Sequence, residues 1–318
     1  MISDLARLGR SQETVRRLAF GCEQLGGHAW GTVDTREIER AIELAIERGI
    51  RIFDTADCYG LGESERRLAR AVAPHRSRVL IATKFGVRFG SSGKIHYDSS
   101  PEWAERALEE SLKRLGGERV DLFQMHYWDG VTPIAALLDK LERLREQSRI
   151  GWYGLSNYVP GRAELQYPGL VSVSLEYSIA QRSAERVAQR MADAGLAFLS
   201  YGSLGQGVLG GKYRSPACFG ADDRRSGSKY RNFHGETLTR NLRIVDALTA
   251  QARAHAATPA QMAIAWILHK LPAGIPLVGI KRPEQLIDGV SALDLRLEQE
   301  TIAALDDASR PETELLST

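Results

Sequence analysis

Four polar side chains follow three short apolar runs of the sequence, and their types suit proton transfer to a carbonyl oxygen. Asp54 closes one run and Tyr59 lies five residues later, while Lys84 closes the next run and His126 follows the third. A phenol can donate a proton, an ammonium beside it can change its pKa, and an imidazole can hydrogen-bond a substrate. The set therefore predicts acid catalysis on an aldehyde or ketone.

Each of the four residues has an expected role. A tyrosine with an ordinary pKa of about 10 is a weak acid at neutral pH, so we expect the Lys84 ammonium to lower the pKa of Tyr59. Asp54 would keep Lys84 charged and fixed, and His126 would hydrogen-bond the carbonyl oxygen that Tyr59 protonates. Taken singly, each residue also fits a structural role, because polar strand ends are common at barrel rims.

The elements that must position these residues follow an alternating pattern of short apolar runs and amphipathic stretches. The runs that we expect to form strands cover residues 18–22, 50–54, 79–84, 120–125, 150–155, 171–175, 196–201 and 276–280. Eight strand–helix units in ~300 residues predict an α/β fold, a single (β/α)8 TIM barrel spanning residues 1–318 as one domain. The alternative, an open doubly wound sheet, usually carries G-x-G-x-x-G after its first strand, and GCEQLGG there does not fit.

Three helices carry explicit start signals. Ser100 and Pro101 predict an N-cap followed by a proline in the first turn, and Gly116 predicts the end of that helix. Thr258 followed by proline predicts a second start, and Thr35 is expected to cap a third helix.

Two long polar segments, residues 88–100 and 212–235, interrupt the alternation. Both follow strands, so in a barrel both form long loops at the C-terminal face, where barrel active sites lie. Long loops in compact domains are either functional or ordinary surface loops, and the sequence leaves both possibilities open.

Composition excludes several classes of protein. The 318 residues carry 42 basic and 40 acidic side chains, so no basic field predicts nucleic-acid binding. Only eight of the basic residues are lysines, which makes Lys84 within an apolar run unusual. No run reaches the ~18 apolar residues needed to span a bilayer, and the opening stretch lacks the apolar core of a secretory signal. Three dispersed cysteines and scattered histidines predict no disulfide framework and no metal site, and the lack of disulfides favours a cytoplasmic protein. A monomer is the default expectation, and the sequence leaves an oligomer open.

Several segments, in order along nearly the whole chain, resemble the aldo-keto reductases. They are FDTADCYGLGESE (53–65), IATKFG (81–86), DLFQMH (121–126), GLSNY (154–158), SYGSLGQGVLGGKY (200–213), TPAQMAIAWIL (258–268) and GIKRPEQL (279–286). The resemblance implies a barrel that binds NADP(H), needs no metal and uses an Asp-Tyr-Lys-His tetrad. Asp54, Tyr59, Lys84 and His126 match that tetrad position by position.

The resemblance also implies which residues bind the cofactor. Ser156 and Asn157 correspond to the carboxamide contacts, Tyr201 to the ring that stacks on nicotinamide, and residues 202–207 to the pyrophosphate loop. Cations near residue 281 correspond to the 2′-phosphate site, which favours NADPH over NADH. The complete set of expected cofactor residues is Gly21, Cys22, Ser156, Asn157, Ser174, Tyr201, Gly202, Ser203, Leu204, Gln206, Lys212, Gly279, Lys281, Arg282 and Gln285.

The chain departs from the family pattern in three places. Ser174 stands where the family usually has glutamine, and Gly289 stands where it often has an asparagine that meets the adenine. Gly202-Ser203-Leu204 replaces the usual Ser-Pro-Leu. We expect these changes to affect cofactor affinity rather than the fold.

The expected function is NADPH-dependent reduction of an aldehyde or ketone, with Tyr59 as general acid. The same site would serve the reverse oxidation of an alcohol or sugar. Polar loop residues around 89–94 and 222–227 suit a sugar-derived carbonyl, although they equally suit solvated loops or a cofactor lid. The alternative is a regulatory subunit, since the β-subunits of voltage-gated potassium channels resemble the same family.

Overall fold

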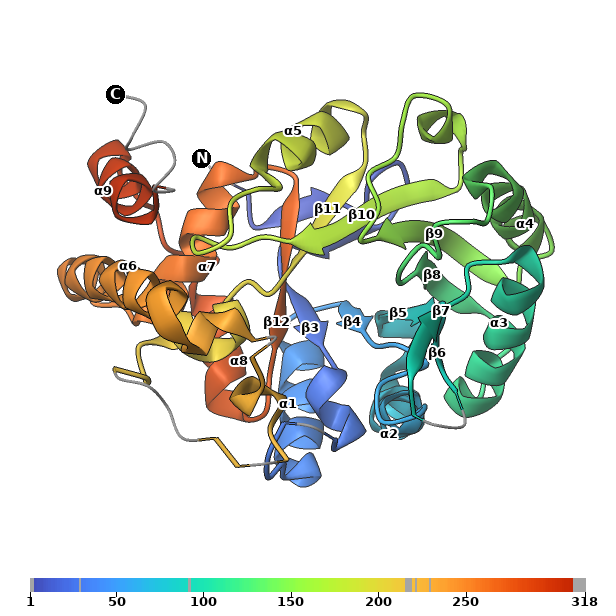
Figure 1. Ribbon diagram of the computed structural model, residues 1–318, viewed down its shortest axis with the longest axis horizontal. Coiled ribbons are helices and arrows are strands. Elements are labelled where there is room, and N and C mark those ends of the chain that lie inside the picture. Colours follow the sequence, from blue (N-terminus) through green and yellow to red (C-terminus); the bar gives the residue numbers. More distant parts are fainter. Residues whose placement is uncertain are drawn as a thin grey trace.

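A computed structural model describes residues 3–28, 30–90, 93–214, 219–220, 222–228 and 230–310 of the chain. Eight parallel strands close into a barrel, and each meets its sequence neighbour until the last pairs with the first (Figure 1). They are β3 (Ala19–Gly21), β4 (Ile52–Asp54), β5 (Leu80–Phe85), β8 (Val120–Met125), β9 (Ile150–Ser156), β10 (Leu170–Glu176), β11 (Ala197–Tyr201) and β12 (Gly274–Gly279). All eight predicted strands are therefore confirmed, and with them the TIM-barrel prediction.

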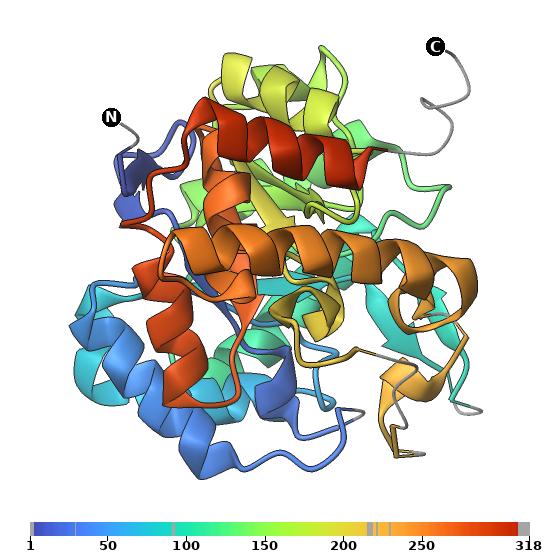
Figure 2. The same cartoon turned by 90° about the vertical axis from the view of Figure 1, so that its left-hand side faces the viewer.

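Helices surround the barrel (Figures 1 and 2). They are α1 (Thr35–Glu47), α2 (Glu63–Val72), α3 (Pro101–Leu115), α4 (Ile134–Glu146), α5 (Glu185–Asp193), α6 (Gly235–Ala254), α7 (Pro259–Lys270), α8 (Pro283–Ser291) and α9 (Gln299–Ser309). Short 3-10 helices are η1 (Glu23–Gly26), η2 (Ala73–Arg78), η3 (Glu164–Gln166), η4 (Gly205–Gly210), η5 (Arg224–Ser226) and η6 (Arg231–Phe233). In the described chain, no helix is long and apolar enough to cross a membrane.

Two of the three predicted helix starts are confirmed. The Ser100 hydroxyl accepts a hydrogen bond from an amide of the first turn of α3, and Gly116 ends that helix with a positive φ of 67°. Thr258 caps α7 and forms a reciprocal capping box with Gln261. The prediction for α1 was one residue late, because the Asp34 carboxylate accepts from the Arg36 amide and Thr35 is already helical.

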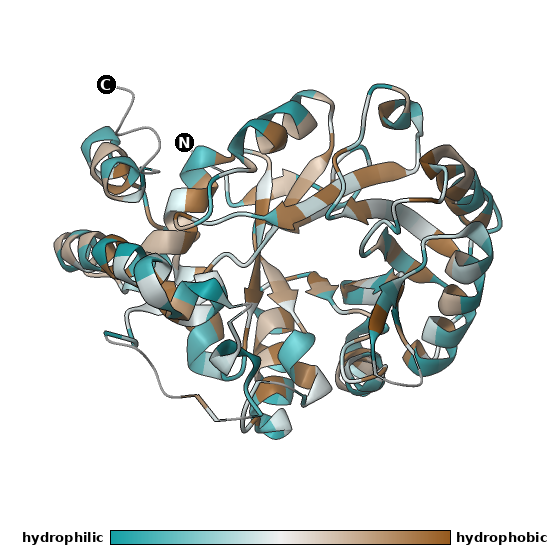
Figure 3. Ribbon diagram, viewed as in Figure 1, coloured by the Kyte–Doolittle hydropathy of each residue, from teal (hydrophilic) through white to brown (hydrophobic). Residues whose placement is uncertain are grey.

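The apolar residues form one cluster inside the barrel and three between the barrel and its helices. Figure 3 shows the consequence, with hydrophobic colour along the strands and hydrophilic colour on the outer helix faces. An N-terminal hairpin, β1 (Leu5–Arg7) with β2 (Thr14–Arg16), adds Leu8 and Val15 to the interior cluster. Burial of these side chains stabilises the barrel by roughly 25 cal/mol per Å² of apolar surface removed from water.

Arg17 ties the hairpin to the end of the barrel. Its buried guanidinium donates to the carbonyl oxygens of Leu268 at 2.9 Å, Gly274 at 3.1 Å and Leu271 at 2.5 Å. These carbonyls come from the end of α7 and the start of β12, so one cation satisfies backbone acceptors at their junction. Burial lowers the pKa of Arg17 to about 10, which leaves it charged at neutral pH.

The segment predicted as a long loop at residues 88–100 contains regular secondary structure. Two strands in this segment, β6 (Val87–Phe89) and β7 (Ile95–Tyr97), pair antiparallel rather than forming an open loop. Residues 91–92 between these strands lie outside the described residues, as do 215–218, 221 and 229 of the second segment. The described part of that second segment contains η5 and η6.

Candidate active site

The predicted Asp54 and Lys84 meet at the ends of adjacent parallel strands. Lys84 donates from its ammonium to the Asp54 carboxylate and, at 2.9 Å, to the Thr55 carbonyl oxygen. The two side chains are only 4% and 6% exposed, so the pair is shielded from water. Low exposure strengthens the attraction between the charges and makes each one costly without the other.

Tyr59 and His126 complete the cluster. The ammonium of Lys84 lies 5.2 Å from the centre of the Tyr59 ring. The Tyr59 and His126 rings stand edge to face with centres 5.9 Å apart. Tyr59 comes from the loop after β4 and His126 from the residue after β8, whose amide donates to the Phe85 carbonyl of β5. The structure thus brings together all four residues of the predicted tetrad.

The prediction that the Lys84 ammonium lowers the pKa of Tyr59 is wrong, because this pKa is raised. Burial raises the pKa of Tyr59 well above its usual value, and the nearby carboxylates of Glu23 and Asp54 raise it further. The positive charge of Lys84, which is also paired with Asp54, does not outweigh these effects on the pKa. A phenol that keeps its proton at neutral pH is suited to donate it.

The imidazole of His126 is neutral. Burial lowers the pKa of His126 well below its usual value, and the positive charge of Lys84 lowers it further. Its Nδ1 lies 3.7 Å from the Cys58 sulfur, and the Tyr127 ring stacks on it with centres 5.0 Å apart. A neutral imidazole in this position can donate one hydrogen bond to a substrate oxygen. The Cys58 thiol has a pKa raised by burial, so it lacks the thiolate character of a reactive cysteine.

Gln124 is a site residue that the sequence reasoning missed. It is fully buried on β8, and its Nε2 donates to the second carboxylate oxygen of Asp54 at 3.2 Å. Gln124 lies two residues before His126, so strand periodicity directs both side chains to the same side. That spacing is the signal that would have found it.

Three of the expected cofactor residues join the tetrad through hydrogen bonds. The Tyr201 hydroxyl donates to Asn157 Oδ1 at 2.6 Å, and Asn157 Nδ2 donates to the His126 carbonyl at 3.0 Å and to Ser156 Oγ at 3.1 Å. Asn157 adopts a positive φ of 56°, which this residue type tolerates better than most. The side-chain amide of Asn157 and the ring of Tyr201 therefore lie at the edge of the candidate site in a fixed orientation.

Ser174 supplies an observation that fits a bound cofactor. Its hydroxyl is buried and, within the described part of the chain, has no hydrogen-bond partner. Its carbonyl accepts from the Asn157 amide at 2.9 Å, so the free hydroxyl lies beside the expected carboxamide contacts. Buried hydroxyls are normally satisfied, and a carboxamide would satisfy this one.

The expected pyrophosphate loop has a backbone suited to an anion. Gly205, Gln206 and Gly207 all have positive φ, at 54°, 54° and 103°. Successive amides in such a turn converge to form an anion-binding nest. The Ser203 hydroxyl donates to the Ser200 carbonyl at 2.7 Å. The backbone amide of Ser203, rather than its side chain, is therefore the group that could contact a bound anion. Gln206 donates to Glu176 at 3.3 Å, which fixes one side of the turn.

Close packing surrounds two of the expected cofactor glycines, Gly21 and Gly279. A Cβ at Gly279 would lie 2.7 Å from the Gln24 side chain, and one at Gly21 would lie 3.2 Å from the Val278 carbonyl. Cys22 uses its amide to hold the Asp54 carbonyl at 2.8 Å, and its thiol lies in the apolar core. Leu204 is also packed against that core.

The expected phosphate site lies at the start of α8. Lys281 donates from Nζ to the Trp30 carbonyl at 2.8 Å, and the Gln285 side chain accepts from the Lys281 amide at 2.8 Å. Arg282 is exposed at the N-cap of α8. Burial lowers the pKa of Lys281, and the nearby positive charges of Arg225, Arg282 and Lys212 lower it further, against the opposing effect of Asp223. Cations at a helix N-terminus suit a phosphate.

Gly289 lies further along α8 and is buried against Leu18, where a Cβ would come within 3.2 Å of the leucine side chain. The family's asparagine at this position would therefore displace Leu18, which gives a physical reason for the departure.

Part of the second long polar segment, residues 222–228, packs against the segment that follows β3. Arg224 pairs with Glu23 and lies 5.2 Å from the Trp30 ring centre, and Trp30 forms a β-bridge to Asp223. These contacts join the segment after β11 to the segment after β3. Among the described residues, no three His, Cys, Asp or Glu side chains meet as a metal site would require.

The fold and the site define an oxidoreductase barrel, and sequence comparison identifies the family. The aldo/keto reductase family model matches residues 17–310. The chain belongs to the aldo/keto reductase family. This confirms the predicted family and enzyme class.

Relatives cover almost the whole chain. An aldo-keto reductase of Schizosaccharomyces pombe, whose name includes NADP(+), is 31% identical over 93% of this chain and 89% of its own. A probable aldo-keto reductase of Glycine max is 30% identical over 95% and 88%. Among solved structures, a glycerol dehydrogenase of Gluconobacter oxydans has a TM-score of 0.86 at 29% identity, with 97% of this chain and 95% of that one covered. An aldo-keto reductase of Bacillus halodurans, at 24% identity, has a TM-score of 0.76 over 96% and 95% and supports the fold.

Proposed function

We propose that the protein is an NADPH-dependent reductase of small aldehydes and ketones, with Asp54, Tyr59, Lys84 and His126 as its catalytic residues. The observation that carries the proposal is the convergence of Tyr59 and neutral His126 beside the buried Lys84–Asp54 pair. The named NADP(+) dependence of the fission-yeast relative supports the choice of cofactor.

The chain's own residues have distinct tasks. His126 donates a hydrogen bond to the carbonyl oxygen and orients it toward Tyr59. Tyr59 then donates its phenolic proton to that oxygen as negative charge develops there. Lys84 stabilises the phenolate left on Tyr59, and Asp54 and Gln124 keep Lys84 in place. The raised pKa of Tyr59 ensures that the proton is present at neutral pH.

The expected cofactor residues fit NADPH. Ser156, Asn157 and Ser174 would hold the carboxamide, and Tyr201 would stack on the nicotinamide ring. The turn at 205–207 would receive the pyrophosphate, and the Lys281 region the 2′-phosphate. When bound, NADPH supplies the hydride that reduces the carbonyl carbon.

Aromatic side chains mark the substrate side of the site. The Tyr97 ring stacks on Tyr127 with centres 4.9 Å apart, and Tyr127 stacks on His126. This column connects the β6–β7 hairpin with the tetrad. Together with the similarity to a glycerol dehydrogenase, it supports small carbonyls that carry hydroxyl groups, and the corresponding alcohols in reverse. The cytoplasmic location, the single domain over residues 1–318 and the monomeric state stay predictions.

The test is steady-state reduction of a panel of aldehydes, ketones and open-chain sugars, followed by loss of NADPH absorbance with NADH in parallel. We expect turnover on part of the panel and a preference for NADPH. Negligible turnover on the whole panel, together with co-purification with a membrane channel, would instead support the regulatory alternative.

A further inference from the structure

A second group of buried charges lies behind the tetrad, and the proposed chemistry does not use it. Asp57 is in the middle of the loop that joins Asp54 to Tyr59, and its amide donates to the Lys84 carbonyl at 3.2 Å. Its Oδ1 is buried and, within the described residues, has no hydrogen-bond partner. The backbone of Asp57 therefore connects two catalytic segments, and its carboxyl group lies where an unshared charge is costly.

Glu65 on α2 is the neighbour of that carboxyl group. It is fully buried. Its Oε1 accepts from the Thr83 hydroxyl at 2.6 Å and its Oε2 from Arg114 Nε at 2.5 Å. Thr83 directly precedes Lys84 on β5, so the group joins the strand that carries the catalytic lysine.

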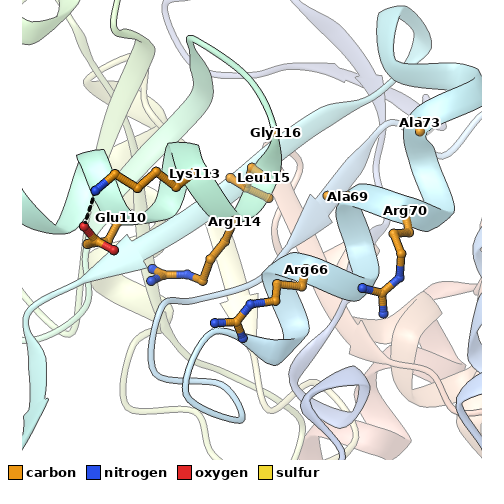
Figure 4. A pocket seen from close by; sticks show the side chains of 9 residues that line it. All are labelled: Arg66, Ala69, Arg70, Ala73, Glu110, Lys113, Arg114, Leu115 and Gly116. Carbon is orange, nitrogen blue, oxygen red and sulfur yellow. Dashed lines mark hydrogen bonds and ion pairs between the residues drawn. The ribbon is translucent and has the colours of Figure 1, made fainter.

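Arg114 on α3 lies between the buried Glu65 and the solvent. Its side chain is 17% exposed, and it also contacts the Ser111 hydroxyl at 3.2 Å. On its outer side it lines a basic surface depression of about 670 Å³, together with Arg66, Arg70 and Lys113 (Figure 4). Its guanidinium is thus held from inside by Glu65, while its outer edge faces water.

The negative charges near Asp57 outnumber the positive ones when the carboxyl groups of Asp57 and Glu65 are both ionised. The cations that face Asp57 are Arg114 and Lys84, and each already holds another carboxylate, Glu65 or Asp54. Burial and the negative charge of Glu65 raise the pKa of Asp57 to about 7, against the opposing effects of Arg114, the Cys58 amide and Lys84. A proton on Asp57 resolves the imbalance that the geometry creates.

We propose that Asp57 is a positioning residue whose proton adjusts the acidity of Tyr59, with Glu65 and Arg114 fixing the pH at which this happens. The inference rests on the proposed function, because it assigns the pH dependence of that reaction to a group outside the tetrad. Ionised Asp57 adds a negative charge that interacts with Lys84, so less of the lysine's positive charge is available to the phenolate of Tyr59. Tyr59 then holds its proton more tightly and becomes the weaker acid.

The activity test is the pH profile of kcat for carbonyl reduction between pH 5.5 and 8.5. We expect the wild-type rate to fall about threefold to tenfold as pH rises through about 7. Asp57→Asn, which keeps the shape and loses the charge, should remove this step and keep the rate of the low-pH plateau. Asp294→Asn, which removes an exposed carboxylate of the same type, should leave the step in place.

A second variant tests the role of the neighbours. Glu65→Gln removes the like charge and keeps an acceptor for Thr83, so the step should move to lower pH. A step that stays in place in Glu65→Gln, or wild-type and Asp57→Asn profiles that coincide, would overturn the proposal.

Thermal unfolding supplies a readout that does not depend on turnover. In the folded protein Asp57 binds its proton more tightly than in the unfolded chain, so its contribution to stability is lost as pH rises through about 7. The Tm of Asp57→Asn should therefore exceed that of the wild type by more at pH 8 than at pH 5.5. An equal Tm difference at both pH values contradicts the proton on Asp57, whereas a protein that reduces no carbonyl contradicts only the proposed function.

Discussion

The ammonium of Lys84 and the carboxylate of Asp54 form an ion pair whose side chains are 4% and 6% exposed, at the ends of neighbouring strands. Thr55 and Gln124 complete the hydrogen bonds of the pair, at 2.9 Å and 3.2 Å. The barrel register brings these groups together: Asp54 pairs with Ala82 on β5, Lys84 lies two residues further along that strand, and Lys84 itself pairs with Gln124 on β8.

Breaking this pair should cost stability as well as activity. Lys84→Met leaves Asp54 buried without its cation, and we expect a loss of about 3–5 kcal/mol in the free energy of unfolding. Urea denaturation measures this loss. Lys140→Met, which breaks a more exposed pair with Glu105, should cost less than about 1 kcal/mol. Equal losses in the two variants would show that the Lys84 pair does not behave as a buried one.

The neutral His126 predicts a dependence of stability on pH. Its pKa is lowered in the folded protein, so the unfolded chain binds the proton more readily. Stability should therefore fall as pH drops below about 6.5, with this residue contributing up to ~1.4 kcal/mol per pH unit. Urea denaturation between pH 5 and 8 should show a shallower fall for His126→Gln than for the wild type. His96→Gln, at an exposed position of β7, should leave the slope unchanged, and matching slopes for all three proteins would refute a neutral His126.

The buried Arg17 predicts a large structural effect far from the tetrad. Arg17→Met leaves carbonyl oxygens of residues 268, 271 and 274 without their donor, and we expect a loss of about 2–4 kcal/mol. Arg7→Met, at an exposed position of β1, should change stability by less than about 0.5 kcal/mol. Chemical denaturation of both variants distinguishes a buried anchor from a surface charge.

Lys281 should determine the preference for NADPH. Lys281→Met removes a cation from the expected 2′-phosphate site, so KM for NADPH should rise about tenfold or more while KM for NADH changes little. Steady-state kinetics at varied concentrations of each cofactor measures the two KM values. Lys94→Met, at an exposed position next to β7, is the matched control, and an equal rise for both cofactors in Lys281→Met would argue against a phosphate contact.

The sequence predicts those features of the site that follow from strand topology. Asp54, Lys84 and His126 each lie at the end of an apolar run, and parallel strands bring such ends to one face of a barrel. Their neighbourhood could therefore be predicted without coordinates. The capping residues of α3 and α7 are local signals and were also readable.

Features that depend on three-dimensional packing could not be predicted from the sequence. The pKa of Tyr59 follows from its burial and from the carboxylates around it, and Glu23 comes from a different segment. The spacing of Gln124 from His126 indicates the side of the strand on which it lies, but its hydrogen bond to Asp54 depends on how the strands pack. The β6–β7 hairpin escaped prediction because two strands of three residues carry too little alternation to stand out in a polar segment.

The central claim is that Tyr59 donates the proton in carbonyl reduction, and Tyr59→Phe tests it most directly. The variant should be compared with the wild type in kcat for the best aldehyde of the panel, with NADPH binding followed by fluorescence. We predict a loss of kcat of about 100-fold or more with NADPH affinity unchanged. Undiminished turnover in Tyr59→Phe would contradict the account.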